Sequence, residues 1–560
     1  MKLRTSFFDK TVLQKDITRF APLWAIYFIG GLLIMLNVAD SNQGYYAAKS
    51  VGETIAFLGI VNFIYAGLAA QLIFGDLFNS RLCNALHAMP MRRENWLVTH
   101  TVAGLLFSLV PNSVGIFLVM FRLGAYWYVA LIWLLGMTMQ YLFFFGLAVF
   151  SVFCTGNRFA MVAVYGILNF AAMIALWFAQ VVYQPMLYGI ELPTEPFSLL
   201  CPIVQITMND EMLLWDNQID RFVGFGEGWI YLAVLAFLGA GLLVLSAVMY
   251  RRRRLEVAGD FIAVAPLAPV FSVVFTLCVG AVFASFGELV GNSYVPYLLV
   301  GLLVGWFSGR MLLQRTVKVF SGKNFLRLAI LVVAVLVSVG LTKLDPIGIT
   351  RWTPDAEQVK SLSVSDNRVN YGEGDVVTQD PQKIQAFIDV HRYVIENGEI
   401  RDGGLSRKVS LFFSYKMKDG RTVKRNYQAW VNDGIYAKLQ TLCSDVTVYF
   451  PYEDWRSNPQ RLREIEIDGQ HLGEEHYEGL LNAIIKDCEE GNMAYSHQYH
   501  SDGSSAKEKQ WISITYIRDD GVHDVREVWV YEECKNTIAW LEENRDAWFT
   551  ERNYGDMDIS

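Results

Sequence analysis

The sequence lacks the short motifs that mark most enzymes and redox proteins. Its seven cysteines include no Cys-x-x-Cys pair, which argues against a zinc ribbon or a thioredoxin-like site, and their odd number argues against a complete disulfide framework. It contains no G-x-x-x-x-G-K-[ST] phosphate-binding loop and no G-x-S-x-G nucleophile elbow. We therefore expect no catalytic site, no cofactor bound by this chain, and no ATP hydrolysis by the chain itself.

Histidines are few, and their spacing does not favour a metal site. His471 and His476 are five residues apart, which places them on different faces of a helix, whereas helical zinc sites use spacings of three or four. His497 and His500 are three apart, but they lie in a sequence typical of a polar loop. We predict no metal site here. Basic runs with interleaved aromatic residues are also missing from the acidic C-terminal part, so no nucleic-acid partner is expected.

Charge is distributed unevenly between two parts of the chain. Residues 344–560 hold 25 Lys and Arg and 39 Asp and Glu, a net charge of −14, and read as a water-soluble sequence. The whole chain of 560 residues has a net charge of −8, so residues 1–343 carry +6. The first part is therefore cationic and apolar, and the second is an acidic domain or pair of domains.

Nine apolar runs occupy most of the first part, each close to the ~20 residues that cross a bilayer. They cover residues 20–38, 55–75, 97–121, 126–153, 159–182, 229–250, 266–286, 295–313 and 325–341. No Asp, Glu or Lys lies deep in a run, which disfavours an ion-coupled carrier with a charged relay. Uncharged polar residues within the runs either line a path or join helices to one another: Asn62, Gln71, His100, Asn112, Gln140, Asn169 and Gln180.

The distribution of basic residues predicts the orientation of these runs. With the N-terminus inside the cell, 18 of the 22 Lys and Arg residues up to Lys343 fall on the inner side. No cleavable signal peptide is apparent, because the first apolar run is too long and lacks a small-residue cleavage site. An odd number of spans then places residues 344–560 outside the cell, so the expected location is a cell membrane crossed many times.

Two short segments on the inner side have amphipathic patterns. Residues 1–19 interleave basic and apolar side chains at helical spacing and predict an interfacial cytoplasmic helix. In residues 76–96 apolar side chains recur at steps of three and four, which predicts a short helix with one apolar stripe: Phe78, Leu82, Ala85, Leu86 and Met89. Arg81 lies off the stripe, and Pro90 ends the helix. Such a helix either lies in the membrane interface or docks into a partner's groove.

The second part contains a weak internal duplication. Each copy has a short strand, a helical run and a strand pair turned at an Asp-Gly step, namely Asp419-Gly420 or Asp520-Gly521. A further helical stretch follows each copy, at residues 433–442 and 532–542. We predict two α+β lobes, at residues 344–457 and 458–560. Before the sixth span, residues 183–228 form a long outside loop that either carries short surface helices or is a plain flexible loop.

The first 250 residues resemble a known family. The basic N-terminus, the first six spans and the string Leu86-His-Ala-Met-Pro-Met-Arg-Arg93 resemble permease subunits of exporter-type ATP-binding-cassette transporters. The sequence is most similar to longer permeases of Gram-positive, clostridia-like bacteria that end in an external domain. The resemblance implies a six-span permease core at residues 20–250 with a coupling helix at 76–96, and three further spans at 251–343 depart from that pattern.

The resemblance also implies partners and a mechanism. Phe78, Leu82 and Leu86 would enter a groove of a cytoplasmic ATPase that uses ATP and Mg, while Arg81, Arg92 or Arg93 would meet acidic residues at its rim. A second copy or a related permease would complete the translocation path. The acidic outer lobes make a cationic antimicrobial peptide a candidate for export or resistance, although their charge also serves solubility alone. The alternative is a membrane-anchored receptor whose outer lobes bind a ligand or partner.

Overall fold

The computed structural model divides the chain into two compact units. One comprises Met1–Val182 and Leu192–Ser338, and the other comprises Tyr183–Glu191 and Val339–Ser560. The structure describes residues 8–39, 44–88, 92–123, 127–208, 213–216, 221–226, 228–252, 259–264, 266–291, 293–366, 376–378, 381–398, 408–430, 459–490, 492, 508–517, 523–532 and 534–545.

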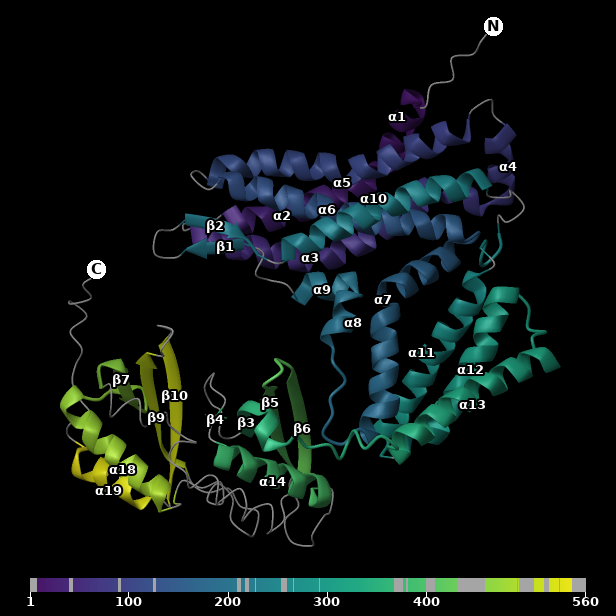
Figure 1. Cartoon of the computed structure of the whole chain (residues 1–560). Coiled ribbons are helices and arrows are strands. Elements are labelled where there is room, and N and C mark those ends of the chain that lie inside the picture. The colour runs from purple at the N-terminus through teal and green to yellow at the C-terminus, as the bar shows by residue number, and fades with distance from the viewer. Residues whose placement is uncertain are drawn as a thin grey trace. The chain divides into compact units, whose positions relative to one another are not determined.

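Long apolar helices make up most of the first unit (Figure 1). They are α2 (Ala21–Ala39), α3 (Gly44–Ile73), α5 (Arg93–Leu123), α6 (Trp127–Cys154), α7 (Arg158–Tyr183), α10 (Gly228–Arg252), α11 (Leu267–Leu289), α12 (Tyr294–Gln314) and α13 (Gly322–Leu344). Among the described residues, eight helices are long and apolar enough to cross a membrane. A ninth is obtained if α2 is joined to α1 (Lys10–Arg19) across a 64° bend. The chain is thus a polytopic helical protein, and each of the nine predicted apolar runs overlaps one of these helices.

Helix α6 is the centre of the bundle, and glycine lets α10 approach it closely. In α6, 78% of the most apolar stretch is buried, against 11% in α13. A Cβ atom added to Gly146 of α6 would lie 2.3 Å from the backbone oxygen of Gly239 in α10. The two backbones therefore touch without an intervening layer of side chains, as small residues permit between helices in lipid.

The polar residues within the spans are largely used to join helices. Asn62 accepts a hydrogen bond from the Tyr27 hydroxyl at 2.8 Å and donates one to Gln140 Oε1 at 3.1 Å. Gln140 donates in turn to the Ile55 carbonyl oxygen at 2.8 Å, and Asn112 donates to the Tyr27 hydroxyl at 3.2 Å. Asn62, Asn112 and Gln140 are buried. Two roles were predicted for these polar residues, lining a path or joining helices, and the contacts support the joining of helices for Asn62, Asn112 and Gln140.

The loop before α10 is more structured than the sequence indicates. It contains a 3₁₀ turn η3 (Gln184–Met186), the short helices α8 (Glu195–Leu199) and α9 (Pro202–Met208), and the antiparallel pair β1 (Leu213–Asp216) and β2 (Arg221–Phe225). Short helices were one of the two predicted forms, whereas the strand pair was not predicted. Residues 183–191 belong to the second unit.

The second unit contains two sheets with the same strand order. The first sheet has the order β4-β3-β5-β6, and the second has the order β8-β7-β9-β10. Lobe one comprises β3 (Val359–Asp366), β4 (Val376–Thr378), α14 (Pro381–Asn397), β5 (Lys408–Met417) and β6 (Thr422–Trp430). Lobe two comprises β7 (Leu462–Ile467), β8 (Gln470–His471), α18 (Tyr477–Glu489), β9 (Glu508–Ile517), β10 (His523–Tyr531) and α19 (Lys535–Glu543). The same strand order in both lobes agrees with the weak internal duplication of the sequence.

Local sequence explains the β5–β6 hairpin of lobe one. Its turn passes through Gly420, whose φ of +90° favours a residue without a side chain. Side chains buried in β5 and β6 alternate with exposed ones and pack with α14 in one core. The predicted turn at Asp520-Gly521 and the predicted helix at 433–442 lie outside the described residues.

Candidate functional site

The polar turn between α3 and α5 is built from two short helical pieces. The 3₁₀ turn η1 (Gly75–Phe78) follows α3, and α4 (Ser80–Ala88) follows η1. Asn79 separates them in an extended conformation. Its side-chain Oδ1 accepts a hydrogen bond from the Arg81 backbone N–H at 3.0 Å, so Asn79 caps the start of α4.

This break changes the surface that the sequence predicts. The stripe was expected to run from Phe78 through Leu82 on one helix, but α4 begins only at Ser80. Phe78 packs against the core of the bundle, and Cys83 is 3% exposed. Leu82 is 49% exposed, and Arg81 beside it is also exposed. Phe78 therefore faces the bundle while Leu82 faces away from it.

The remaining predicted residues are spread over two elements. Arg92 is exposed just before α5, and Arg93 is the first residue of α5 and half-buried. Residues 93–96 thus belong to the long helix and not to a separate coupling helix. Leu86 lies in α4, but its side chain is outside the described part of the chain. Within α4, the exposed side that the structure describes contains Arg81, Leu82, Asn84, Ala85 and Ala88.

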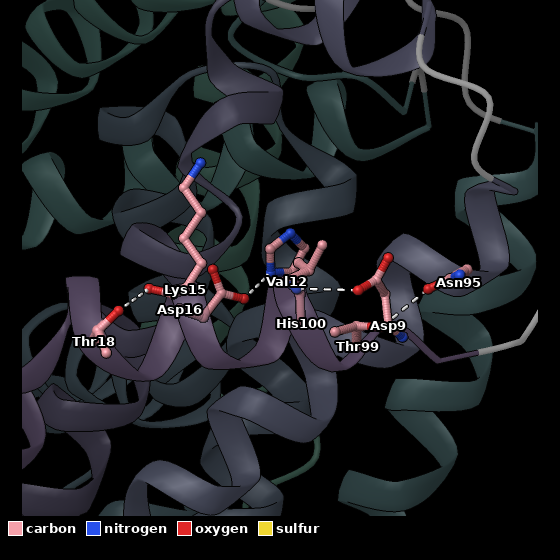
Figure 2. A network of polar contacts seen from close by, with 8 residues as sticks. All are labelled: Asp9, Val12, Lys15, Asp16, Thr18, Asn95, Thr99 and His100. Carbon is pink, nitrogen blue, oxygen red and sulfur yellow. Dashed lines mark hydrogen bonds and ion pairs between the residues drawn. The ribbon is translucent and has the colours of Figure 1, made fainter.

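A buried polar contact between Asp16 and His100 joins the N-terminal helix α1 to α5. Asp16 Oδ2 of α1 and His100 Nδ1 of α5 are 2.5 Å apart, and both residues are buried (Figure 2). Asp9 caps α1 by accepting from Thr11 N–H at 2.8 Å, and its own N–H donates to Thr99 Oγ1 at 3.1 Å. Helix α1 is therefore docked on α5 as well as amphipathic.

Aromatic rings extend this contact toward the polar turn. The His100 ring lies 4.4 Å from the Trp96 ring and 5.9 Å from the Phe74 ring, measured between centroids. Phe74 immediately precedes η1, and it is fully buried. A continuous line of packed side chains thus runs from α1 through α5 to the start of the η1–α4 segment.

Segments that adjoin this polar turn also pack against one another. Gln71 donates to the backbone oxygen of Arg158, at the start of α7, at 3.1 Å. Glu94 of α5 and Arg251 of α10 form an ion pair at 3.4 Å. The Gly156 N–H donates to the Asp260 carbonyl oxygen at 3.0 Å, which joins the α6–α7 turn to the segment after α10. These contacts join α3 to α7 and α5 to α10.

Comparisons with known proteins add no relative to this picture. No protein-family description, no curated protein and no solved structure matches the chain. The family resemblance therefore remains an expectation, and the site is interpreted from its own geometry.

A second group of polar side chains, all of them titratable, lies on the β7–β8 hairpin of lobe two. Glu464, Glu466 and His471 have their ligand atoms within 4.8 Å of one another, a spacing that suits a metal ion. His471 Nδ1 contacts a carboxylate oxygen of Glu464 and lies 3.3 Å from one of Glu466, so the group is equally explained as a histidine packed between two carboxylates. His476 instead lies 3.8 Å from Glu475. His497 and His500 are outside the described residues.

Lobe one holds a fully buried histidine in its core. His391 of α14 is bonded through Nδ1 to the Tyr415 hydroxyl at 2.8 Å and through Nε2 to the Tyr427 hydroxyl at 2.7 Å. Burial, aided by the charges of Arg425 and Arg392, lowers the pKa of His391 from 6.5 to about 3. The imidazole is therefore neutral at physiological pH and serves the packing of lobe one.

Sequence reasoning missed the role of Asp16, although a signal was present. Asp16 is the one acidic residue among Val12, Leu13 and Ile17, at the helical spacing of the apolar stripe of α1. An acid on an apolar stripe needs a partner, because an isolated buried carboxylate is costly. His100, inside an apolar run, was the available partner.

Proposed function

We propose that this chain is the membrane-spanning permease subunit of an ATP-driven exporter, coupled to separate cytoplasmic ATPase subunits. The observation that carries the proposal is the η1–α4 segment. It is a short helix attached to the bundle through Cys83 and the neighbouring Phe78, and it presents Leu82 and Arg81 on the opposite side. A rigidly supported helix with an exposed apolar residue and an adjacent cation suits docking into a partner's groove.

The packing around this segment supports a mechanical role. Force applied to α4 would reach α5 and α1 through buried contacts, since the Asp16–His100 pair and the aromatic rings connect these elements to Phe74, just before η1. Closure of two ATPases would then rock the spans between inward-facing and outward-facing states. A second copy of this chain, or a related permease, would supply the other half of the path.

The composition of the second unit supports the proposed orientation. Residues 183–191 and 339–398 fold into the same unit, although α10, α11, α12 and α13 lie between them in the chain. Two segments of one folded body lie on one side of a membrane, so an even number of crossings separates them. Four spans satisfy this condition. With the N-terminus inside and five spans before residue 183, both segments are outside the cell.

Replacing Leu82 by Asp tests the coupling surface. The variant places an unpaired carboxylate in the proposed contact, at a cost on the order of several kcal/mol. We expect Leu82→Asp to insert normally, since Leu82 is exposed, and to lose the ATPase on purification from membranes of the native host. Val317→Asp is the matched control, because Val317 is also exposed (71%) and lies in the inner turn after α12. Equal ATPase recovery with both variants would refute coupling through α4.

Recovery of no ATPase even with the unmodified chain would favour the receptor alternative, in which the outer lobes sense a ligand. The orientation is tested separately with a cysteine added after Ser560. We expect this cysteine to react with a membrane-impermeant thiol reagent in intact cells. Labelling that occurs only after lysis would refute the proposed nine-span arrangement.

A further inference from the structure

The outer edge of lobe one is partly covered by a distant segment of the same chain. Strand β6 pairs with β5 on one side and ends the sheet on the other. On its outer side, the Asn426 N–H donates to the Gly189 carbonyl oxygen at 3.0 Å, and the Trp430 N–H donates to the Gly398 carbonyl oxygen at 2.7 Å. Unpaired edge groups are a template for binding another strand, and here Gly189 takes one of them.

Side chains make this contact specific. Asn426 Nδ2 donates to Glu191 Oε1 at 2.5 Å, and the rings of Tyr188 and Tyr427 meet edge to face with centroids 5.0 Å apart. Gly189 has a φ of +75°, and a Cβ atom there would lie 2.0 Å from the Tyr427 ring. Glycine at 189 is therefore required both by the backbone conformation and by the close approach of the tyrosine.

The covering segment follows α7 directly and is folded on itself. Gln184 Nε2 donates to the Ile190 carbonyl oxygen at 2.5 Å, and the Ile190 N–H donates to the Leu187 carbonyl oxygen at 3.0 Å. Residues 184–191 are thus a compact turn that is closed by its own hydrogen bonds. We refer to them as the strap.

A second turn, at residues 345–350, follows α13 and is bound by Arg425 of β6. Arg425 is buried and donates to the Ile349 carbonyl oxygen at 3.1 Å, with its guanidinium 5.6 Å from the Trp352 ring centroid. Asp345, the first residue after α13, accepts from Ile349 N–H at 2.8 Å and from Thr350 N–H at 2.9 Å. This turn is therefore closed by its own hydrogen bonds and follows α13 directly.

We propose that β6 is a tie that joins the C-terminal end of α7 to the C-terminal end of α13. Three consecutive residues provide it: Arg425 holds the turn after α13, while Asn426 and Tyr427 hold the strap after α7. Lobe one then moves with α7 as well as with α13, to which it is covalently attached. Separation of these two helix ends would therefore pull the strap away from β6.

Exchanging the amide of Asn426 for a carboxylate tests the tie. Asn426→Asp places a carboxylate against Glu191 and removes the donated hydrogen bond. In full-length protein in lipid nanodiscs, we expect amide hydrogen exchange at residue 426 and across residues 184–191 to accelerate by about tenfold or more. Gln428→Glu is the matched control, because it makes the same chemical change on the same face of β6, where Gln428 contacts Ser410 instead.

A double variant checks that the contact itself is responsible. Adding Glu191→Gln to Asn426→Asp restores an amide–carboxylate pair with donor and acceptor exchanged, and we expect slow exchange to return. Acceleration in Gln428→Glu equal to that in Asn426→Asp, or no acceleration in Asn426→Asp, would overturn the strap contact.

The consequence for lobe one is measured with spin labels on genetically encoded ketone residues at Glu195 and Lys416, both exposed. We expect the distribution of distances between the labels to broaden in Asn426→Asp and to narrow again in the double variant. A distribution that stays narrow after the strap is released would show that β6 does not govern the position of lobe one, and would overturn the tie. Neither readout requires the ATPase partner, so failure of the proposed function leaves this result unaffected.

Discussion

Acidification should destabilise lobe one through His391. The imidazole is fully buried, bonded to two tyrosine hydroxyls, and stacked 4.8 Å from the Phe413 ring. Its pKa is about 3 in the folded lobe and 6.5 in an unfolded chain. Between these values the unfolded state binds the extra proton, so stability is complete above pH 6.5 and falls as the pH is lowered toward 3.

The size of this effect follows from the two pKa values. Lowering the pH from 8 to 5 should reduce the free energy of opening of lobe one by roughly 2 kcal/mol, equivalent to about a 30-fold loss of protection against amide exchange. The measurement is hydrogen exchange of the β5 amides in the full-length protein, with labelling times adjusted for the intrinsic pH dependence of exchange.

A His391→Gln variant provides the comparison, since glutamine offers a donor and an acceptor but does not titrate in this range. We expect this variant to be less stable than the parent at pH 8, because glutamine does not reproduce the ring packing. Its stability should change less between pH 8 and pH 5. Parallel pH dependence in the parent and the variant would refute the assignment of the effect to His391.

Two further substitutions test the packing of the helical unit. Gly239→Ala should lower the melting temperature, because the new Cβ would lie 2.5 Å from Phe143 Cα. Gly241→Ala is the control and should leave the melting temperature unchanged, because nothing lies within 4 Å of its Cβ position. Scanning fluorimetry in detergent measures both variants, and equal melting temperatures would contradict the α6–α10 contact. Asp16→Ala should release α1, because leaving the buried His100 without its partner costs about 1–3 kcal/mol, while Asp16→Asn, which keeps an acceptor for His100, should do so less. Hydrogen exchange of α1 measures this, with exposed Lys15→Ala as the control; unchanged exchange in Asp16→Ala would show that the pair does not hold the helix.

Patterns confined to neighbouring residues predicted much of the fold. Every apolar run overlaps a helix, because length and hydrophobicity alone specify a span. The hairpin at Gly420 was evident from its Asp-Gly turn, and the duplication predicted from matching motifs agrees with the strand order that the two sheets share. The stripe through Phe78 and Leu82 was wrong as a single helical face, because Asn79 caps α4 with its own side chain and excludes Phe78 from the helix.

Contacts between distant residues were not predictable from these patterns. Glu191 and Asn426 are 235 residues apart, and neither belongs to a motif that names the other. The strap reads as an ordinary loop, and Gly189 becomes informative only when Tyr427 is placed against it. For the same reason, α1 was predicted to lie in the membrane interface and not to dock on α5. The helical period identifies an apolar face but not the helix that covers it.

The direct backbone contact between α6 and α10 limits how this bundle can rearrange. Helices separated by side chains can slide as rotamers change, but Gly146 and Gly239 leave no such layer, so rotation of one helix would drive its side chains into the other backbone. The pair should therefore behave as one rigid rod. Between α3 and α7, by contrast, side chains make the contact: the rings of Phe63 and Tyr165 stack 11° from parallel, and the Tyr165 hydroxyl donates to the Phe63 carbonyl oxygen at 2.9 Å. We expect any rearrangement of the bundle to leave the α6–α10 rod intact and to occur where side chains separate the helices.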